Sequence, residues 1–404
     1  MITPIREVVA AVDLAKLRAW WWHRQGLDGS LHGRSPAEVL ERTGWARSVG
    51  GSNPYLTLFA RVGTSRAEAD RAVSALDIYE LPAARGCTYV VPSVHFGLAL
   101  QVGRHAPEAD LKVLDRLGVA RKEIDRLCAD VLGVLDRADA LDPAQLKDFL
   151  GDSVRSLGEE GRKRGQSTTL PAALGLLQAA GEIRRVPANG RLDQQRYAYT
   201  RWSPPSTGVD DAAARAELAR LYVDWIAPAS VAHFRWFSAF SAAQTKAALA
   251  QLDLVDVGEG LLAPAALAKE FGAYVPPAKP RYHLLASIDA LVLLRRDHHA
   301  LLDESGLAAM VAGDKTSLGG VADLPDHAIV DRGRIVGLWQ YDFDAAAVIA
   351  WVFGGKADKA LTEAIERTTV YIRDQLGDAR SFSLDSPRSR APRIAALTES
   401  RSAS

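Results

Sequence analysis

The feature that most constrains the fold is a helix-start signature, three copies of which begin predicted helical units. In each copy, a Ser or Asp is followed three positions later by Glu or Gln. Such a capping box closes the first turn of a helix, because the two side chains satisfy backbone groups that lack partners inside the helix. The copies are Ser35-Pro36-Ala37-Glu38, Asp142-Pro143-Ala144-Gln145 and Ser241-Ala242-Ala243-Gln244. They indicate three helical units in tandem.

A β-hairpin is predicted at the end of each unit. The clearest one surrounds Pro187-Ala188-Asn189-Gly190, because Asn-Gly is a strong turn signal between β-rich stretches. The predicted strand pairs are 78–81 with 88–91, 183–186 with 196–199, and 254–257 with 261–262. Helices followed by a hairpin are the order of a winged helix. We therefore predict three winged-helix domains, over residues 1–105, 106–205 (with a linker helix at Asp110–Arg137) and 206–275.

The chain becomes β-rich after residue 275. The predicted strands are Tyr282–Ile288, Ala290–Arg295, Ala328–Asp331 and Ile335–Tyr341, followed by a helix over Lys356–Leu376. We expect a small β-barrel-like domain with a terminal helix at residues 276–376. The tail at 377–404 is rich in Ser, Arg and Pro with few apolar residues, so loose order is expected there. The predicted fold class is α+β.

Charge and cysteine content exclude several classes of protein. The 404 residues include 49 Lys+Arg and 49 Asp+Glu, so only a local basic patch is available to bind nucleic acid. Two cysteines are too few for a disulfide framework or a Cys-rich zinc site. No apolar run reaches membrane-spanning length, and no phosphate-loop, dinucleotide or hydrolase-triad motif occurs. We expect a cytoplasmic monomer with no metal, cofactor or membrane partner.

Three consecutive tryptophans, Trp20–Trp22, lie in the first predicted helix and cannot share one face of it. Packing against a second layer explains them, and a surface that stacks on bases is the alternative.

The strongest local charge lies in the second unit. Residues 155–201 contain nine basic and four acidic side chains, a net charge of +5. The basic run just before the predicted recognition helix, together with the hairpin, suits phosphate contacts from side chains and helix-terminal amides. The candidate DNA-binding residues are Arg162, Lys163, Arg164, Thr168, Arg184, Arg185, Arg191 and Arg196. The alternative is a solvated basic face.

Five segments occur in an order that resembles a known family. They are Arg24-Gln25-Gly26-Leu27, residues 85–92, residues 227–234, Ser287-Ile288-Asp289 with Arg296-Asp297, and residues 333–339. Over about Leu14 to Trp339 the chain resembles the AlkZ/YcaQ-like bacterial DNA glycosylases. The resemblance implies tandem winged helices, a C-terminal β-domain, binding of duplex DNA and removal of alkylated purines. Some members unhook interstrand crosslinks and protect producers of DNA-alkylating antibiotics.

The stretch Gly44–Tyr55, a Gly-rich turn between two predicted helices, lies where that family has its catalytic motif of Gln, any residue, then Gln or Asp. Counting back from Pro54 puts Arg47 and Val49 at the two motif positions, with Ser48 between them, and the stretch contains no Gln. Glycosidic cleavage needs a positioned water and stabilisation of an oxocarbenium-like sugar. A Val has no polar atom for this, and the charge of an Arg disfavours a cation.

Three functions fit these observations. The first is a DNA-binding protein that has lost or replaced the glycosylase motif and shields lesions, senses them or regulates transcription. The second is an active glycosylase that uses Ser48, Asn53 and a carboxylate such as Asp297. The third is a small-molecule binder that sequesters a drug between the winged units.

Overall fold

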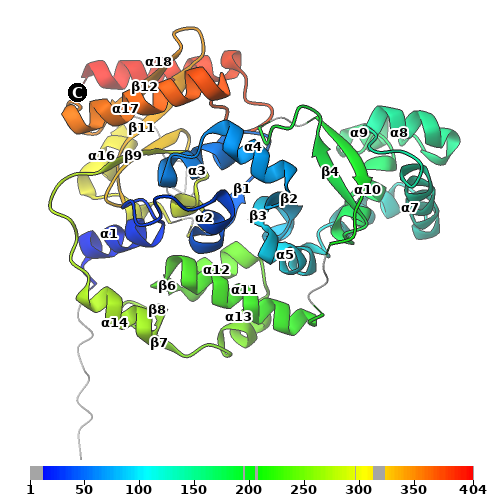
Figure 1. The fold of residues 1–404 in the computed structure, drawn as a ribbon, viewed down its shortest axis with the longest axis horizontal. Helices are drawn as coiled ribbons and strands as arrows, with labels where there is room; N and C mark the ends of the chain where they lie inside the picture. Colours follow the sequence, from blue (N-terminus) through cyan, green and yellow to red (C-terminus); the bar gives the residue numbers. More distant parts are fainter. Residues whose placement is uncertain (1–11, 194–195, 205–207, 296, 313–323, 404) are drawn as a thin grey trace, which may run out of the picture.

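The computed structural model describes residues 12–193, 196–204, 208–295, 297–312 and 324–403 (Figure 1). Its content is 51% helix and 16% strand, which confirms the α+β class. The helices surround small antiparallel sheets, and α7 to α10 lie at the opposite end of the molecule from α17 and α18. The described part of the chain contains no helix long and apolar enough to cross a membrane.

The first unit places a three-stranded sheet among five helices. The helices are α1 (Leu14–Arg24), α2 (Pro36–Thr43), α3 (Asn53–Val62), α4 (Arg66–Ser74) and α5 (Phe96–Gly103). The strands are β1 (Ala46–Arg47), β2 (Ile78–Pro82) and β3 (Thr88–Pro92), in the order β1-β3-β2. Ser35 and Glu38 form the predicted capping box of α2. The short strand β1 was not predicted, and it fixes the Gly44–Tyr55 stretch to the predicted hairpin β2–β3.

The second unit consists of five helices and the predicted hairpin. They are α6 (Glu108–Arg116), α7 (Arg121–Leu135), α8 (Pro143–Leu150), α9 (Gly158–Lys163), α10 (Leu170–Ala179), β4 (Ile183–Pro187) and β5 (Tyr197–Arg201). The linker, predicted as one helix, is divided into α6 and α7 because the backbone turns at Gly118 with a φ of 74°. Asp142 and Gln145 form the predicted capping box of α8.

The third unit ends in a small sheet of order β6-β8-β7. Its elements are α11 (Asp211–Ile226), β6 (Ala229–Ser230), α12 (Val231–Ser238), α13 (Ala242–Leu249), β7 (Leu254–Asp256), β8 (Leu261–Pro264) and α14 (Ala265–Ala273). Ser241 and Gln244 form the predicted capping box of α13. The division into winged-helix domains at these boundaries stays a prediction.

The C-terminal region differs from its prediction in three ways. Its elements are β9 (Tyr282–Leu285), α15 (Ala290–Leu293), α16 (Glu304–Ala312), β10 (His327–Asp331), β11 (Arg334–Asp342), β12 (Ala347–Val352), α17 (Lys359–Tyr371) and α18 (Pro387–Ala403). The described strands form an open sheet, β12-β11-β10-β9, in place of a barrel-like closure. Residues 290–293 are helical instead of extended, because the Asp289 carboxylate caps the Leu291 N–H at 2.9 Å. The expected loose tail contains α18, whose Arg390 and Leu397 are buried.

All three tryptophans of α1 are buried, at 1–2% exposure. Trp20 and Trp21 donate hydrogen bonds to the carbonyls of Ala227 and Pro228, while Trp22 donates to His283 of β9. The helix therefore packs against two layers at once, and the alternative of a base-stacking surface is wrong.

Candidate functional site

The segment Ala46–Ser52, here called the motif loop, runs from β1 to the start of α3. Ala46 and Glu80 both pair with Val90, so these three side chains share one face of the sheet. Side chains alternate along a strand, so Ser48 points to that same face, and its hydroxyl donates a hydrogen bond to the Glu80 carboxylate. Arg47 pairs with Tyr89 and points to the opposite face.

Glu80 is the functional candidate that sequence reasoning missed. Its side chain lies beneath the β4–β5 hairpin, and the residue is 5% exposed. Burial raises the pKa of Glu80, while the Ser48 hydroxyl and the nearby Arg185 charge act in the opposite direction. The only signal in the sequence was an acid inside the apolar strand Ile78–Pro82, where charged side chains are rarely placed without a partner.

The opposite face of β1 carries Arg47, at the first of the family's motif positions, and Val49, at the second, lies in the bend after the strand. The Arg47 guanidinium donates to the Thr88 carbonyl at 2.7 Å and lies 5.5 Å from the centroid of the Tyr89 ring. Its own carbonyl accepts from Asn53 at 2.7 Å, so Asn53, 1% exposed, holds the loop instead of facing a substrate. The Val49 carbonyl accepts from the Ser383 N–H at 3.0 Å.

Asp297, the proposed carboxylate partner, makes its described contacts elsewhere. It lies 3.6 Å from His233 of α12 and accepts from the Ala300 N–H at 3.2 Å. The hydrogen bond from His233 lowers the pKa of Asp297. Within the described residues, no hydrogen bond or ion pair joins Asp297 to the motif loop. Ser48 lies on the motif loop, Asn53 begins α3 directly after it, and the carboxylate that reaches the loop is Glu80.

The predicted DNA-binding arginines of the β4–β5 hairpin lie on both of its faces. Arg185 and Tyr197 share the face toward Glu80, and the Arg185 guanidinium lies 5.0 Å from the Tyr197 ring. Side chains alternate along each strand, so Arg184 and Arg196 point to the opposite face of the hairpin from Arg185 and Tyr197. Arg196 is exposed. The hairpin therefore presents Arg184 and Arg196 outward.

The remaining predicted DNA contacts are divided between a loop and α9. Arg191 pairs with Asp193 and donates to the Leu376 carbonyl at 2.9 Å, which ties the hairpin loop to the C-terminal region. Arg162, Lys163 and Arg164 are exposed at the end of α9, and Thr168 is half-buried. The predicted recognition helix α10 carries no charged side chain and buries most of its residues.

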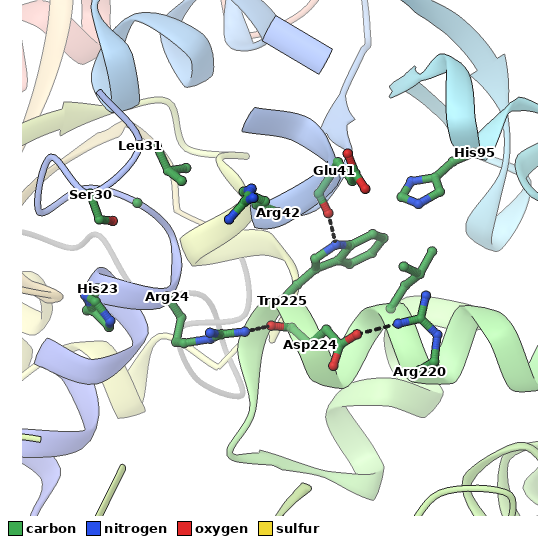
Figure 2. A pocket seen from close by; sticks show the side chains of 12 residues that line it. His23, Arg24, Ser30, Leu31, Glu41, Arg42, His95, Arg220, Asp224 and Trp225 are labelled. Carbon is green, nitrogen blue, oxygen red and sulfur yellow. Dashed lines mark hydrogen bonds and ion pairs between the residues drawn. The ribbon is translucent and has the colours of Figure 1, made fainter. Parts of the chain in front are cut away.

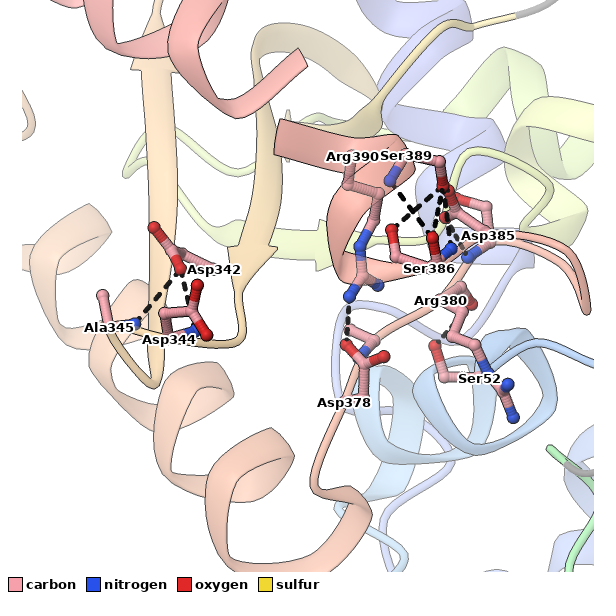
Figure 3. Close-up of polar contacts among 12 residues, drawn as sticks. Ser52, Asp342, Asp344, Ala345, Asp378, Arg380, Asp385, Ser386, Ser389 and Arg390 are labelled. Carbon is pink, nitrogen blue, oxygen red and sulfur yellow. Dashed lines mark hydrogen bonds and ion pairs between the residues drawn. The ribbon is translucent and has the colours of Figure 1, made fainter. Parts of the chain in front are cut away.

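The C-terminal segment covers one side of the motif loop. The Arg380 carbonyl accepts from both the N–H and the hydroxyl of Ser52, at 2.9 and 3.0 Å (Figure 3). A Cβ added at Gly51 would lie 2.4 Å from the Ser381 carbonyl oxygen. The backbones are therefore so close that only glycine fits at position 51.

A cavity of about 400 Å³ opens between α1, α2 and α11 (Figure 2). Arg24 and Arg220 on its wall both contact Asp224, through the backbone carbonyl and the carboxylate respectively. His95 also lines it, accepts from the Trp45 indole at 3.1 Å, and has a pKa lowered to about 4 by burial. A small-molecule binder would hold its ligand here, but Trp20–Trp22 do not line this cavity. No group of three or more potential metal ligands occurs among the residues described.

Comparison with known proteins identifies the class. The family model described as DNA glycosylase AlkZ-like matches residues 40–369, so the chain belongs to the AlkZ-like DNA glycosylase family. A solved structure, the Streptomyces sahachiroi DNA glycosylase AlkZ, is similar with a TM-score of 0.68 and 19% identity. The match covers 92% of this chain and 99% of that chain. At this identity the likeness shows the fold. No curated protein matches the chain.

Proposed function

We propose that this protein binds duplex DNA at alkylated purines and does not hydrolyse the glycosidic bond. The chemistry at the motif positions supports this most. Arg47 offers a positive charge that opposes an oxocarbenium ion, and Val49 offers no side-chain acceptor for a water. The carboxylate that reaches the motif loop, Glu80, accepts a hydrogen bond from Ser48 on the face of β1 opposite to Arg47.

Basic side chains of the second unit supply the proposed phosphate contacts, within a frame of tandem winged helices. Arg184 and Arg196 project from the outer face of the hairpin, and Arg162 is exposed on α9. Lys163 and Arg164 pair with acids on the same helix, at 3.1 and 2.8 Å. Such exposed pairs contribute only about 0–1 kcal/mol each, so a phosphate can replace the carboxylate.

Replacing Arg184 and Arg196 together by Ala is expected to weaken binding to all duplex sequences alike. Each lost phosphate contact should reduce the slope of log affinity against log salt concentration by about 1. The measurement is a fluorescence-anisotropy titration at several salt concentrations. The control variant is Lys359→Ala with Arg373→Ala, which also removes two positive charges, from exposed sites in the C-terminal region. It should leave the slope of log affinity against log salt concentration unchanged. Equal slopes for all three proteins would show that the hairpin does not contact phosphate.

Excision is tested on a duplex with one N7-methylguanine, followed by alkali, which breaks the strand at an abasic site. The expected result is a mobility shift without strand breaks. Arg47→Gln with Val49→Gln restores the family's side chains and is expected to introduce breaks at the lesion. Breaks made by the unmodified protein at the same rate as by this variant would contradict the proposal.

One observation favours an active glycosylase as the second candidate, namely the hydrogen bond that places the buried Glu80 carboxylate on the motif loop. If the unmodified protein does break the strand, Glu80→Gln should slow excision roughly 100-fold or more, which is typical of a lost general base. Because Gln can still accept from Ser48 and carries no charge, the variant should fold normally.

A further inference from the structure

Two large apolar side chains project from the C-terminal segment into solvent. Phe382 is 44% exposed and Leu384 is 83% exposed, although the residues between and beside them, Ser381, Ser383 and Asp385, are buried or half-buried. We call residues 381–385 the C-terminal turn. Apolar side chains of this size, close together and exposed, are a common mark of a binding surface.

Hydrogen bonds and an ion pair hold the turn in one shape, and Figure 3 shows Asp385, its last residue, among its polar neighbours. The Asp385 N–H donates to the Phe382 carbonyl at 3.0 Å, and the Ser381 N–H donates to the Asp385 carboxylate at 3.1 Å. That carboxylate also pairs with Arg393 of α18 at 2.5 Å. The exposure of Phe382 and Leu384 is therefore a property of a fixed turn supported by a helix.

The turn is attached to the motif loop and to the hairpin of the second unit. Ser383 donates its N–H to the Val49 carbonyl at 3.0 Å. Arg380, directly before the turn, accepts from Ser52 and donates to the Asp193 carbonyl at 2.6 Å. The two apolar side chains thus emerge from a turn bonded to both elements for which lesion and phosphate contacts are proposed.

The segment around the turn has a small positive charge, and one of its arginines, Arg388, is exposed. Residues 378–393 contain four arginines and two aspartates. Both aspartates are engaged by arginines, Asp378 by Arg390 and Asp385 by Arg393, whereas Arg388 is exposed at the start of α18. Arg388 is thus placed to contact a phosphate close to the exposed Phe382 and Leu384, as basic neighbours of a wedge that unstacks a base step do.

We propose that Phe382 and Leu384 form an apolar wedge that enters a base step of duplex DNA beside the alkylated purine. The turn lies beyond residue 369, where the match to the family model ends. The inference rests on the proposed DNA binding. In the proposed complex, one base step of the bound duplex is unstacked, and this gives the motif loop better access to the lesion.

The test uses the full chain and a duplex with 2-aminopurine next to one N7-methylguanine, because 2-aminopurine fluoresces more strongly when unstacked. The unmodified protein is expected to raise the fluorescence several-fold. Phe382→Ala with Leu384→Ala should abolish the rise and weaken binding about tenfold, the effect of losing roughly one buried leucine. Val275→Ala, at a side chain that is 81% exposed, is the matched control and should behave as the unmodified protein.

The outcomes separate this proposal from the proposed function. No binding of DNA at low salt would end both. Binding without a fluorescence rise, or a rise that persists in the double variant, would overturn the wedge and leave DNA binding intact. If sedimentation shows a dimer that the double variant breaks, the turn is instead an interface between two copies, and the wedge is equally overturned. Thermal unfolding of the variants should match that of the unmodified protein, because both side chains are exposed.

Discussion

Replacing Asp289 by Ala is expected to lower the free energy of unfolding by about 3–5 kcal/mol. Asp289 and Arg61 form a buried ion pair with N–O distances of 2.9 and 3.0 Å and side-chain exposures of 1% and 0%. The substitution leaves the guanidinium buried with the neutral partners Gln25 and Thr57. Because a folded domain is stable by only about 5–15 kcal/mol, urea denaturation will resolve the loss easily.

Two controls make the interpretation specific. Arg34→Ala removes one partner of an exposed ion pair and should cost at most about 1 kcal/mol. Arg61→Met with Asp289→Leu removes both buried charges and should be less destabilised than Asp289→Ala, since no charge is left without a partner. If Asp289→Ala lowers the free energy of unfolding by less than about 1 kcal/mol, water must reach Arg61 in the variant. The ion pair would then contribute little to holding α3 against the β-rich region.

Gly333→Ala is expected to cost about 2–5 kcal/mol, from a left-handed backbone and a steric clash together. Gly333 has a φ of 85° in the turn between β10 and β11, and an added Cβ would lie 1.9 Å from the Arg18 carbonyl oxygen of α1. The clash is with backbone, so α1 or the turn must move. Thermal unfolding measures the cost.

The control for this substitution is Gly354→Ala. Gly354 also has a positive φ, 64°, but an added Cβ meets nothing within 4 Å. Gly354→Ala should therefore lower the free energy of unfolding by about 1–2 kcal/mol, the cost of a left-handed backbone without a steric clash. If the two variants unfold at the same temperature, α1 and the turn adjust freely and the close approach contributes nothing to stability.

Local sequence signals predicted the helix starts and hairpins because their causes lie within a few residues. The capping boxes at Ser35, Asp142 and Ser241 formed as expected. The hairpin turn at Asn189-Gly190 likewise joins β4 to β5. The same local reasoning failed at Ala290, where an apolar β-rich stretch became a helix because Asp289 caps it while bound to Arg61.

The functional site depended on contacts that no local pattern records. The position of Arg47, Ser48 and Val49 came from resemblance, but only the pairing of β1 with β3 shows that Ser48 faces away from Arg47. Glu80 lies 32 residues from Ser48 in the chain, and the hydrogen bond that joins them crosses the intervening strand β3. Asp297, the carboxylate chosen from the sequence, makes its described contacts with α12 and with Ala300.

The sequence by itself determined where the three helices with predicted capping boxes begin, the family, and the chemical types present at the motif positions. Tertiary structure decided which face of β1 each of those side chains occupies. It also decided that the C-terminal tail, expected to be loose, is a supported turn bonded to the motif loop. The reason is that caps and turns are satisfied within four residues, whereas a site is assembled from strands and segments up to about 300 residues apart, as Ser52 and Arg380 are.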